Sequence, residues 1–516
     1  MGSVANILLS SIVFSPLLAI IVLAFVPSHQ GGAIKKVGVF GTLLPLLLSL
    51  WMFGAFRYDT ANLQFVEKHD WISIPIGMSQ MGQAGTVFTF DINYELGVDG
   101  ISMPLILLTT IIAALAATAS WSIKKRVKEY FILFHILLIG MLGVFAADNL
   151  FLFFIFFEMT LVPTFFLIGI WGYGERERAA NKFLLYNGIG SGIMLLAFIV
   201  LFIMLRTLNI DQIATILSTP EHPAAQLMTP AFRYGLFLTL FIAFAIKLPV
   251  FPFHTWMLKV HVQAPPSIVM IHSGILLKMG AYGLIRMGIG FFPEQAYGFS
   301  TWLAVLGIIN VLYGAVLAFV QKDLKMVLAY SSISHMGIVL LGLASMNTIG
   351  FQGAMFQVVS HGFISALLFF LIGVIWDRTE TSMIDDLGGL AKSMPFVSGI
   401  LLAGGMASLG LPGMSGFISE FFAFLGLFGR MPVLAAVGAL GIVLTAVYLL
   451  RAILRTTFGR MPDRFIGLAD AQPMEVIPMV VLLGCIILIG VYPAVLGNPM
   501  QQALKTIVPI VTGIGG

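Results

Sequence analysis

Charged side chains are scarce in this chain. Asp, Glu, Lys and Arg make up only 10% of its 516 residues, whereas soluble domains carry about 25%. Hydrophobic residues reach 59%, and the mean hydropathy is +1.01. No stretch of the sequence is polar enough to form a soluble domain, so the composition predicts a polytopic membrane protein.

Cysteine is almost absent as well. Cys485 is the single cysteine, whereas an iron–sulfur cluster usually needs about four cysteine ligands. No phosphate-binding loop or dinucleotide-binding glycine motif opens a strand–helix–strand unit. We therefore expect no redox centre in this chain. The net charge of +4 is spread over loops and forms no patch that would bind nucleic acid.

Apolar runs of about 20 residues, the length needed to cross a hydrocarbon layer of about 30 Å, recur along the whole chain. They predict an all-α fold of about 14 transmembrane helices. The first run lacks a basic n-region and a small-residue cleavage site, so we expect a retained helix. The predicted spans are 4–26, 34–56, 100–120, 129–147, 149–171, 182–206, 230–256, 265–290, 301–320, 326–345, 351–376, 396–428, 432–457 and 474–497.

The basic residues of the loops predict the orientation, because loops rich in Lys and Arg stay on the cytoplasmic side. Alternate loops carry 18 of the 27 basic residues, the other loops carry 7, and the remaining two lie inside spans. This asymmetry supports the count of spans and predicts that both termini lie outside the cytoplasm.

Two predicted spans contain helix breakers near their middles. Pro249 and Pro252 interrupt the seventh span after Lys247, and Pro412, with glycines on both sides, interrupts the twelfth before Glu420. Broken helices at corresponding places indicate an inverted-repeat transporter and its ion path. The alternative is that the prolines merely kink these helices.

The breaks fall on the fourth member of two groups of five spans. We therefore expect N-terminal helices 1–3 in residues 1–128, a first five-helix repeat in 129–290 and a second, inverted repeat in 301–457. Residues 458–516 should hold helix 14.

Four charged side chains lie well inside the predicted spans. They are Glu158, Lys247, Lys278 and Glu420. A charge at the centre of a bilayer costs at least about 2.5–3.5 kcal/mol on insertion scales, so such residues are usually paired or functional. Glu158 has no cation nearby in sequence, and we expect Lys247 to be its partner. The pair is either a static salt bridge or a switchable one that releases and recovers a proton.

Lys278 lies about 13 residues inside its span, which is too deep for its ammonium to reach an interface easily. His335 and His361 fall within the tenth and eleventh spans, and histidine exchanges protons near neutral pH. Each could instead be a hydrogen-bonded core histidine. Glu420, in the outer half of its span, could release protons outward or stabilise the dipole of a half-helix.

Three more histidines, His254, His261 and His272, cluster around the end of the seventh span. No acidic residue falls among them, and their spacing fits no common zinc pattern. The sequence therefore predicts no metal site there.

Four stretches of the sequence are specific enough to compare with known families: KLPVFPFHTWMLKVHVQAPPSIVMIHSGILLKMGAYGLIR, DLKMVLAYSSISHMG, SHGFISALLFFLIG and LPGMSGFISEF. They resemble the antiporter-like membrane subunits of respiratory complex I, a family shared with multisubunit cation/proton antiporters. The resemblance covers about residues 90–460.

The matching positions imply a proton path through Glu158, Lys247, Lys278, His335, His361 and Glu420. Glutamate at the last of these positions is typical of the M branch, the counterpart of mitochondrial subunit 4, whereas the L and N branches usually carry lysine there. His272 departs from the small or aliphatic residue expected at its position, and the resemblance gives it no role.

The resemblance implies a proton-translocating subunit of an NADH-quinone oxidoreductase, hence part of an enzyme. FMN, iron–sulfur clusters and quinone would be bound by other subunits, and the partners would include the L-type and N-type paralogues and the lipid bilayer. The alternatives are a subunit of a cation/proton antiporter, a stand-alone transporter of a small solute, and an inert scaffold.

Overall fold

The computed structural model describes residues 7–78 and 87–512, and most of them are helical. Thirteen helices in these ranges are long and apolar enough to cross a membrane. Two shorter apolar helices, α17 (Pro395–Ser408) and α18 (Ser415–Phe428), follow one another and together match the predicted twelfth span. The predicted all-α membrane fold is confirmed. Residues 4–6 of the first predicted span lie outside the described residues.

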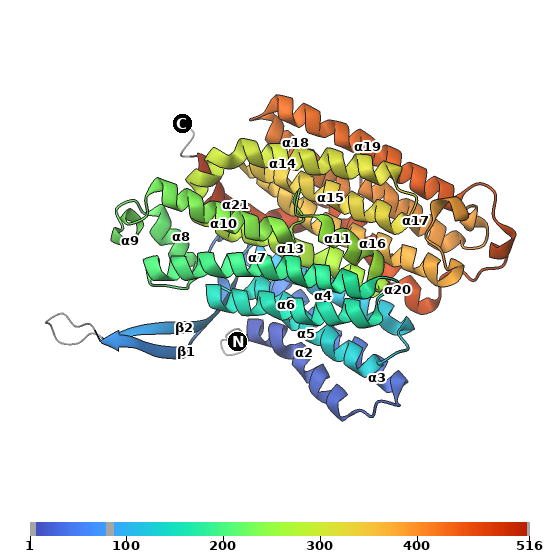
Figure 1. Ribbon diagram of the computed structural model, residues 1–516, viewed down its shortest axis with the longest axis horizontal. Helices are drawn as coiled ribbons and strands as arrows, with labels where there is room; N and C mark the ends of the chain where they lie inside the picture. The colour runs from blue at the N-terminus through green and yellow to red at the C-terminus, as the bar shows by residue number, and fades with distance from the viewer. Residues whose placement is uncertain (1–6, 79–86, 513–516) are drawn as a thin grey trace.

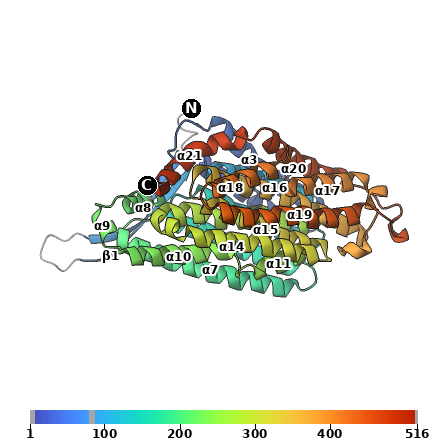
Figure 2. The same ribbon diagram turned by 90° about the horizontal axis from the view of Figure 1, so that it is seen from above.

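The long helices lie side by side in one bundle (Figures 1 and 2). Several begin with proline at the first helical position, where its missing N–H would have no helical partner. The helices of the bundle other than α17 and α18 are α2 (Leu8–Phe25), α3 (Gly31–Ala55), α4 (Ser102–Ala119), α5 (Val127–Ala146), α6 (Leu150–Trp171), α7 (Arg176–Leu205), α10 (Pro230–Lys247), α11 (Thr255–Gln263), α12 (Pro266–Ile271), α14 (Pro293–Val320), α15 (Leu324–Ala344), α16 (Thr348–Thr379), α19 (Pro432–Thr457) and α20 (Pro473–Val491).

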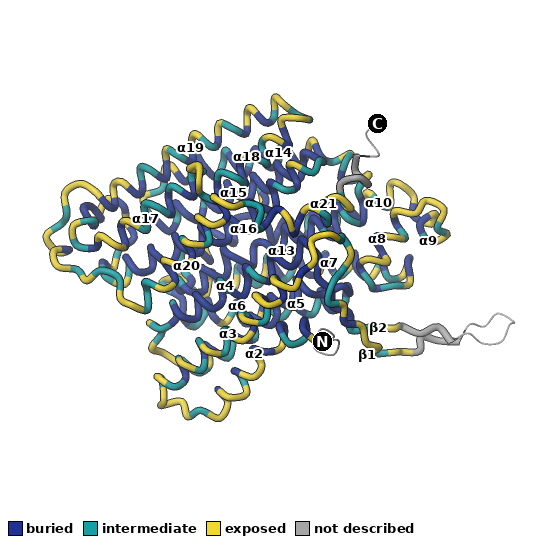
Figure 3. The backbone as a smooth tube through the Cα atoms, turned by 180° about the vertical axis from the view of Figure 1, so that it is seen from behind, coloured by how far each residue is buried: buried dark blue, intermediate teal, exposed yellow. Residues whose placement is uncertain are grey.

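Residues at the centre of the bundle are buried, and exposure increases towards its edge (Figure 3). The span Pro266–Ile289 and α16 are wholly buried along their most apolar windows, whereas only about a third of the corresponding windows of α3, α19 and α20 is buried. The exposed side chains of these outer helices include Leu47, Val443 and Leu488. An apolar periphery suits hydrocarbon or neighbouring subunits, and it leaves the polar residues in the interior.

The eighth span is not a uniform α-helix. It passes from α12 into the π-helical segment η2 (His272–Leu276), then α13 (Leu277–Gly283), then a second π-helical segment, η3 (Leu284–Ile289). α10 packs directly on α13 at Gly280, where a Cβ would lie 2.7 Å from the backbone nitrogen of Leu248. Only glycine allows this close approach.

Two strands that the sequence did not predict, β1 (Gln64–Met78) and β2 (Val87–Val98), form an antiparallel hairpin. The hairpin projects from one end of the bundle, where α8 (Ile210–Ser218) and α9 (Pro223–Gln226) also lie (Figure 1). We call this the hairpin end. The opposite end, called the basic end, is formed by the loops 120–126, 380–394 and 458–472, with their many Lys and Arg residues.

The predicted fourteenth span is shorter in the structure, because α20 ends at Val491, two residues before Pro493. A further helix, α21 (Ala494–Thr512), follows at once.

Candidate functional site

Both predicted helix breaks are present, and each places an ionisable residue beside it. α10 ends at Lys247, and α11 begins at Thr255 after seven residues of turn. The amide of Asn310 on α14 accepts from the backbone N–H of Phe251 at 2.8 Å and donates to the carbonyl of Pro249 at 3.3 Å. Backbone groups freed in the membrane interior are thus satisfied by a neighbouring helix, as the low-dielectric surroundings require.

The second break lies between α17 and α18. Gly410 and Gly413 have φ values of +81° and +91°, a left-handed conformation that favours glycine. A Cβ at Gly410 would lie 2.8 Å from Oε2 of Glu420. The break therefore brings bare backbone against the carboxyl group of Glu420, on the second turn of α18.

Lys278, on α13, is fully buried. Its Nζ donates to the backbone carbonyl of Ser273 at 2.6 Å and lies 2.7 Å from Nδ1 of His361 on α16. The ammonium is thus held by the polar interior, and the alternative that it reaches out to the membrane interface is wrong.

His361 continues the contact towards a second histidine. The ring centroids of His361 and His335, on α15, are 5.3 Å apart. Nδ1 of His335 accepts from the amide Nε2 of Gln357 at 3.1 Å, and its Nε2 lies 3.1 Å from the hydroxyl of Ser408. Because Nδ1 accepts, the proton of the neutral ring is on Nε2.

Glu420 lies next in this series. Its Oε1 is 3.7 Å from Nδ1 of His335, outside hydrogen-bond distance. Glu420 also lines a cavity of about 440 Å³ whose other walls are apolar, among them Phe417, Phe421 and Ala439. The structure therefore brings Lys278, His361, His335 and Glu420 together from four different helices.

Glu158 and Lys247 are not brought into contact. Lys247 is buried, and its Nζ lies over the rings of Phe157 and Phe183, 4.9 Å and 5.7 Å from their centroids. Oε1 of Glu158 is buried without a hydrogen-bond partner among the described residues, and no ion pair within 4.0 Å joins it to Lys247. The expected ion pair is thus absent from this structure, although the charge of Glu158 still acts on Lys247.

Two features of the site escaped the sequence analysis. Gln357 fixes His335, and its amide oxygen accepts from Ser419 at 2.5 Å. His261 and His272 form a direct bond, with Nε2 of His261 2.9 Å from Nδ1 of His272. The three histidines around the end of the seventh span were visible in the sequence, but nothing indicated which of them would meet. Within residues 7–78 and 87–512, no group of three His, Cys, Asp or Glu residues could hold a metal ion.

A polar cluster lies at the hairpin end. Asp99 pairs with Arg286 at 2.7 Å, and its other oxygen accepts from the backbone N–H groups of Ile101 and Ser102. Asp148, in the turn before α6, is mostly buried and accepts from Asn209 at 2.9 Å. Burial, reinforced by the charge of Asp211 on α8, raises the pKa of Asp148 to about 7.

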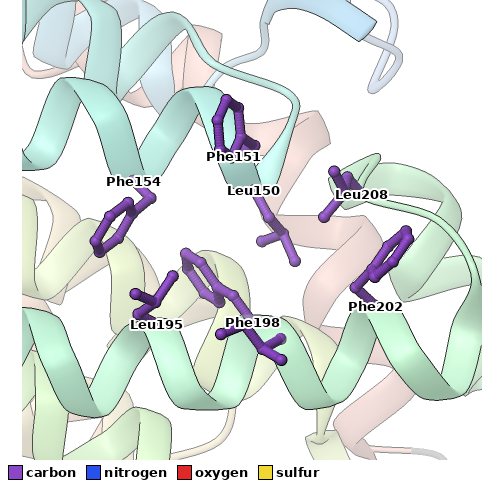
Figure 4. Close-up of a pocket in the computed structure, with 8 residues that line it drawn as sticks. Leu150, Phe151, Phe154, Leu195, Phe198, Phe202 and Leu208 are labelled. Carbon is purple, nitrogen blue, oxygen red and sulfur yellow. The ribbon is translucent and has the colours of Figure 1, made fainter. Parts of the chain in front are cut away.

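A hollow of about 280 Å³ between α6 and α7 has a different character (Figure 4). Leu, Ile and Phe side chains line it, including Phe154 and Phe198. Without a titratable group on its walls, this hollow takes no part in the buried series of ionisable side chains.

The fold and the site together define a polytopic membrane protein whose buried interior carries a contiguous series of ionisable side chains. Comparison with known proteins identifies its family. Residues 147–445 match the family described as NADH:quinone oxidoreductase/Mrp antiporter, and residues 71–145 match the amino terminus of NADH-ubiquinone oxidoreductase chain 4.

Full-length relatives agree with these matches. NADH-quinone oxidoreductase subunit M of Rhodobacter capsulatus is 38% identical, over 97% of this chain and 96% of the relative. NAD(P)H-quinone oxidoreductase chain 4 of Gloeobacter violaceus is 40% identical, over 94% and 89%. A chain of respiratory complex I from Thermus thermophilus superposes with a TM-score of 0.82 at 27% identity, covering 98% of this chain and 99% of that chain. The chain belongs to the family of antiporter-like membrane subunits of NADH:quinone oxidoreductases, in its chain 4, or subunit M, branch.

Proposed function

We propose that the chain is a proton-translocating membrane-arm subunit of an NADH:quinone oxidoreductase. The observation that supports this most directly is the buried series Lys278, His361, His335 and Glu420, with separations of 2.7 Å between polar atoms, 5.3 Å between rings and 3.7 Å between polar atoms. Groups that exchange protons, placed one after another across a membrane interior, form a relay.

In this proposal Glu158 and Lys247 form the switch. When Glu158 approaches Lys247, the carboxylate stabilises the ammonium; when it withdraws, the buried ammonium is disfavoured and its proton can leave. No ion pair within 4.0 Å joins the two groups, but the charge of Glu158 acts on Lys247, so a small approach of the carboxylate would strengthen an interaction that is already present. Export of one proton against 100 mV costs about 2.3 kcal/mol. The switch therefore has to be coupled to the redox reaction, because otherwise protons would flow back down the gradient.

The redox reaction itself belongs to other subunits, which would carry FMN, the iron–sulfur clusters and the quinone site. Electrons from NADH would reach quinone there, and charge rearrangement would reach this chain through the membrane arm. We propose L-type and N-type paralogues as its neighbours and the bacterial inner membrane as its location. The basic end then faces the cytoplasm, with both termini on the outer side.

The two broken spans support the proposal of inverted repeats over residues 129–290 and 301–457. Each break places one ionisable residue of the proposed proton path, Lys247 of the switch at the first break and Glu420 of the relay at the second. This is the arrangement in which transporters place their ion sites.

The test is Glu158→Gln in the assembled complex, reconstituted into vesicles. We expect normal assembly and a marked loss of proton export coupled to quinone reduction, because the amide is nearly isosteric but cannot carry the switching charge. The matched control is Glu129→Gln, which removes a carboxylate that is half exposed beside Arg126. Export and quinone reduction both at wild-type levels in Glu158→Gln would show that the switch is wrong. Sodium-driven proton exchange without electron donor would instead favour a cation/proton antiporter.

A further inference from the structure

An apolar groove runs between α18 and α19 at one edge of the bundle (Figure 1). It is the cavity of about 440 Å³ that Glu420 lines, and we call it the α18–α19 groove. Phenylalanine rings of α18, from Phe417 to Phe428, form one wall, and mainly alanines of α19, among them Ala436 and Ala439, form the other. Methyl groups are too small to fill the space between the rings, so the two helices leave room for a further apolar group.

The groove has the length of one leaflet of a membrane. From Phe417 to Phe428 the helix rises about 16 Å, and half of a hydrocarbon layer of about 30 Å is about 15 Å. Phe421 and Phe428, on the α18 wall, are 51% and 59% exposed. The groove is therefore open to the surroundings of the bundle, which in a membrane are hydrocarbon or a neighbouring subunit.

A basic side chain stands where the groove ends. Arg430 follows the last residue of α18, Phe428, by two positions, in the turn to α19. Its guanidinium lies 4.0 Å from the centroid of the Tyr297 ring on α14. Nη1 of Arg430 is buried and makes no hydrogen bond within the described part of the chain. A charged donor without an acceptor is costly, so this nitrogen indicates an acceptor that comes from outside the chain.

An apolar groove that ends at a cation matches the polarity of a phospholipid. The planar guanidinium of arginine suits phosphate oxygens, and tyrosine is enriched at the level of the lipid head groups. Tyr297 therefore holds Arg430 at the depth where a phosphate lies. A neighbouring subunit could fill the apolar part as well, but it would have to supply an acid at this same depth. A phospholipid supplies both parts in one molecule.

We infer that the α18–α19 groove binds one anionic phospholipid, with its phosphate on Arg430 and one acyl chain along α18. Glu420 lies ten residues before Arg430, which is about 15 Å along a helix. The end of the acyl chain therefore lies beside Glu420 and keeps water from that side of its carboxyl group. The lipid site goes beyond the proposed function and does not depend on it, because it requires only the membrane.

The experiment uses the assembled complex in vesicles that contain a phospholipid with a photoreactive diazirine on its acyl chain. The probe is the phosphatidylglycerol analogue, and the phosphatidylcholine analogue serves as the comparison. After illumination, labelled peptides are identified by mass spectrometry. One basic side chain at the membrane surface favours an anionic lipid about fivefold. We therefore expect peptides of α18 and α19 to carry about five times more label from phosphatidylglycerol than from phosphatidylcholine.

Two variants test the two parts of the site. Arg430→Met keeps an unbranched side chain without the charge and should abolish the preference for phosphatidylglycerol. Ala436→Phe fills the groove and should reduce the label from both analogues. The matched controls are Arg57→Met, which removes an arginine that is 73% exposed beside Asp59, and Val437→Phe, which enlarges the next residue of α19. Both controls should label like wild type.

Equal labelling of the wild type by the two analogues would overturn the site, because Arg430 would then select no head group. Absence of label from α18 and α19 would also overturn it, since that result means that a neighbouring subunit covers the groove. If Arg430→Met does not assemble, Arg430→Lys keeps the charge and should keep the preference, and its loss there contradicts the site. Labelling needs no electron transfer. Failure of the lipid site therefore leaves the proposed function in place, and wild-type export in Glu158→Gln leaves the lipid site in place.

Discussion

Gln357 holds His335 in an orientation that keeps it from Glu420. Its amide Nε2 donates to Nδ1 of His335 at 3.1 Å, and Ser419 fixes the other end of the amide. The same Nδ1 lies 3.7 Å from Oε1 of Glu420, about 0.8 Å beyond a typical hydrogen bond. His335 can exchange a proton with Glu420 only after it leaves Gln357, so the amide restricts the last step of the proposed relay.

The perturbation is Gln357→Met, which keeps the volume of the side chain and removes both hydrogen bonds. Ser419 retains the carbonyl of Gly416 at 2.9 Å, so no buried hydroxyl is left unpaired. A neutral hydrogen bond contributes about 1 kcal/mol net, so its loss should raise the population of the His335–Glu420 contact roughly fivefold. The expected result is a passive proton leak about fivefold larger than in wild type.

The leak is measured in vesicles containing the assembled complex, with an imposed pH gradient and no electron donor. The matched control is Gln352→Met, the same substitution on the same helix and without a bond to His335. A leak in Gln357→Met equal to that of wild type and Gln352→Met would refute the restricting role of the amide. A structure of the variant with Nδ1 of His335 still 3.7 Å from Glu420 would refute it independently.

Two further predictions concern the hairpin end. Burial and the charge of Asp211 raise the pKa of Asp148 to about 7, so the folded chain binds this proton more tightly than the unfolded chain does. The free energy of unfolding should therefore decrease as the pH rises from about 4 to about 7, by a few kcal/mol at most. Asp148→Asn should make the melting temperature less dependent on pH in this range. Arg286→Met breaks the buried ion pair with Asp99 and should destabilise the protein by about 3–5 kcal/mol, because it leaves a buried carboxylate unpaired. Adding Asp99→Asn removes that charge and should restore part of the stability. A double variant that melts below both single variants would contradict this.

The spans could be predicted from the sequence because a hydrocarbon layer selects length and composition. The two breaks followed from the same reasoning, since Pro249 and Pro412 remove backbone donors where no water replaces them. The sequence also indicated Lys278 and Glu420, because a charged side chain inside an apolar span is costly and is therefore usually paired or functional. These are all properties of one helix at a time.

The contacts of the site could not be predicted in the same way, because they depend on how each helix is rotated about its axis. Lys247 was expected beside Glu158, but it lies over the rings of Phe157 and Phe183. His261 and His272 are separated by a helix end at Gln263, and helical periodicity does not continue across such a turn. The hairpin was missed because its strands lie in a segment read only as a loop between spans.

The two π-helical segments on either side of Lys278 have a mechanical consequence. A π-helical turn contains more residues than an α-helical turn, and such turns occur mostly as single bulges inside α-helices, frequently at functional sites. If η2 lost its extra residue while η3 gained one, the helix ends would stay in place and only the stretch Leu277–Gly283 would turn, by about 100°. Such a rotation would carry the ammonium of Lys278 away from His361, and it would also push α10 outward, because Gly280 would leave its close contact with Leu248. A lysine between two adjustable turns can therefore connect and disconnect while the helix that carries it stays anchored.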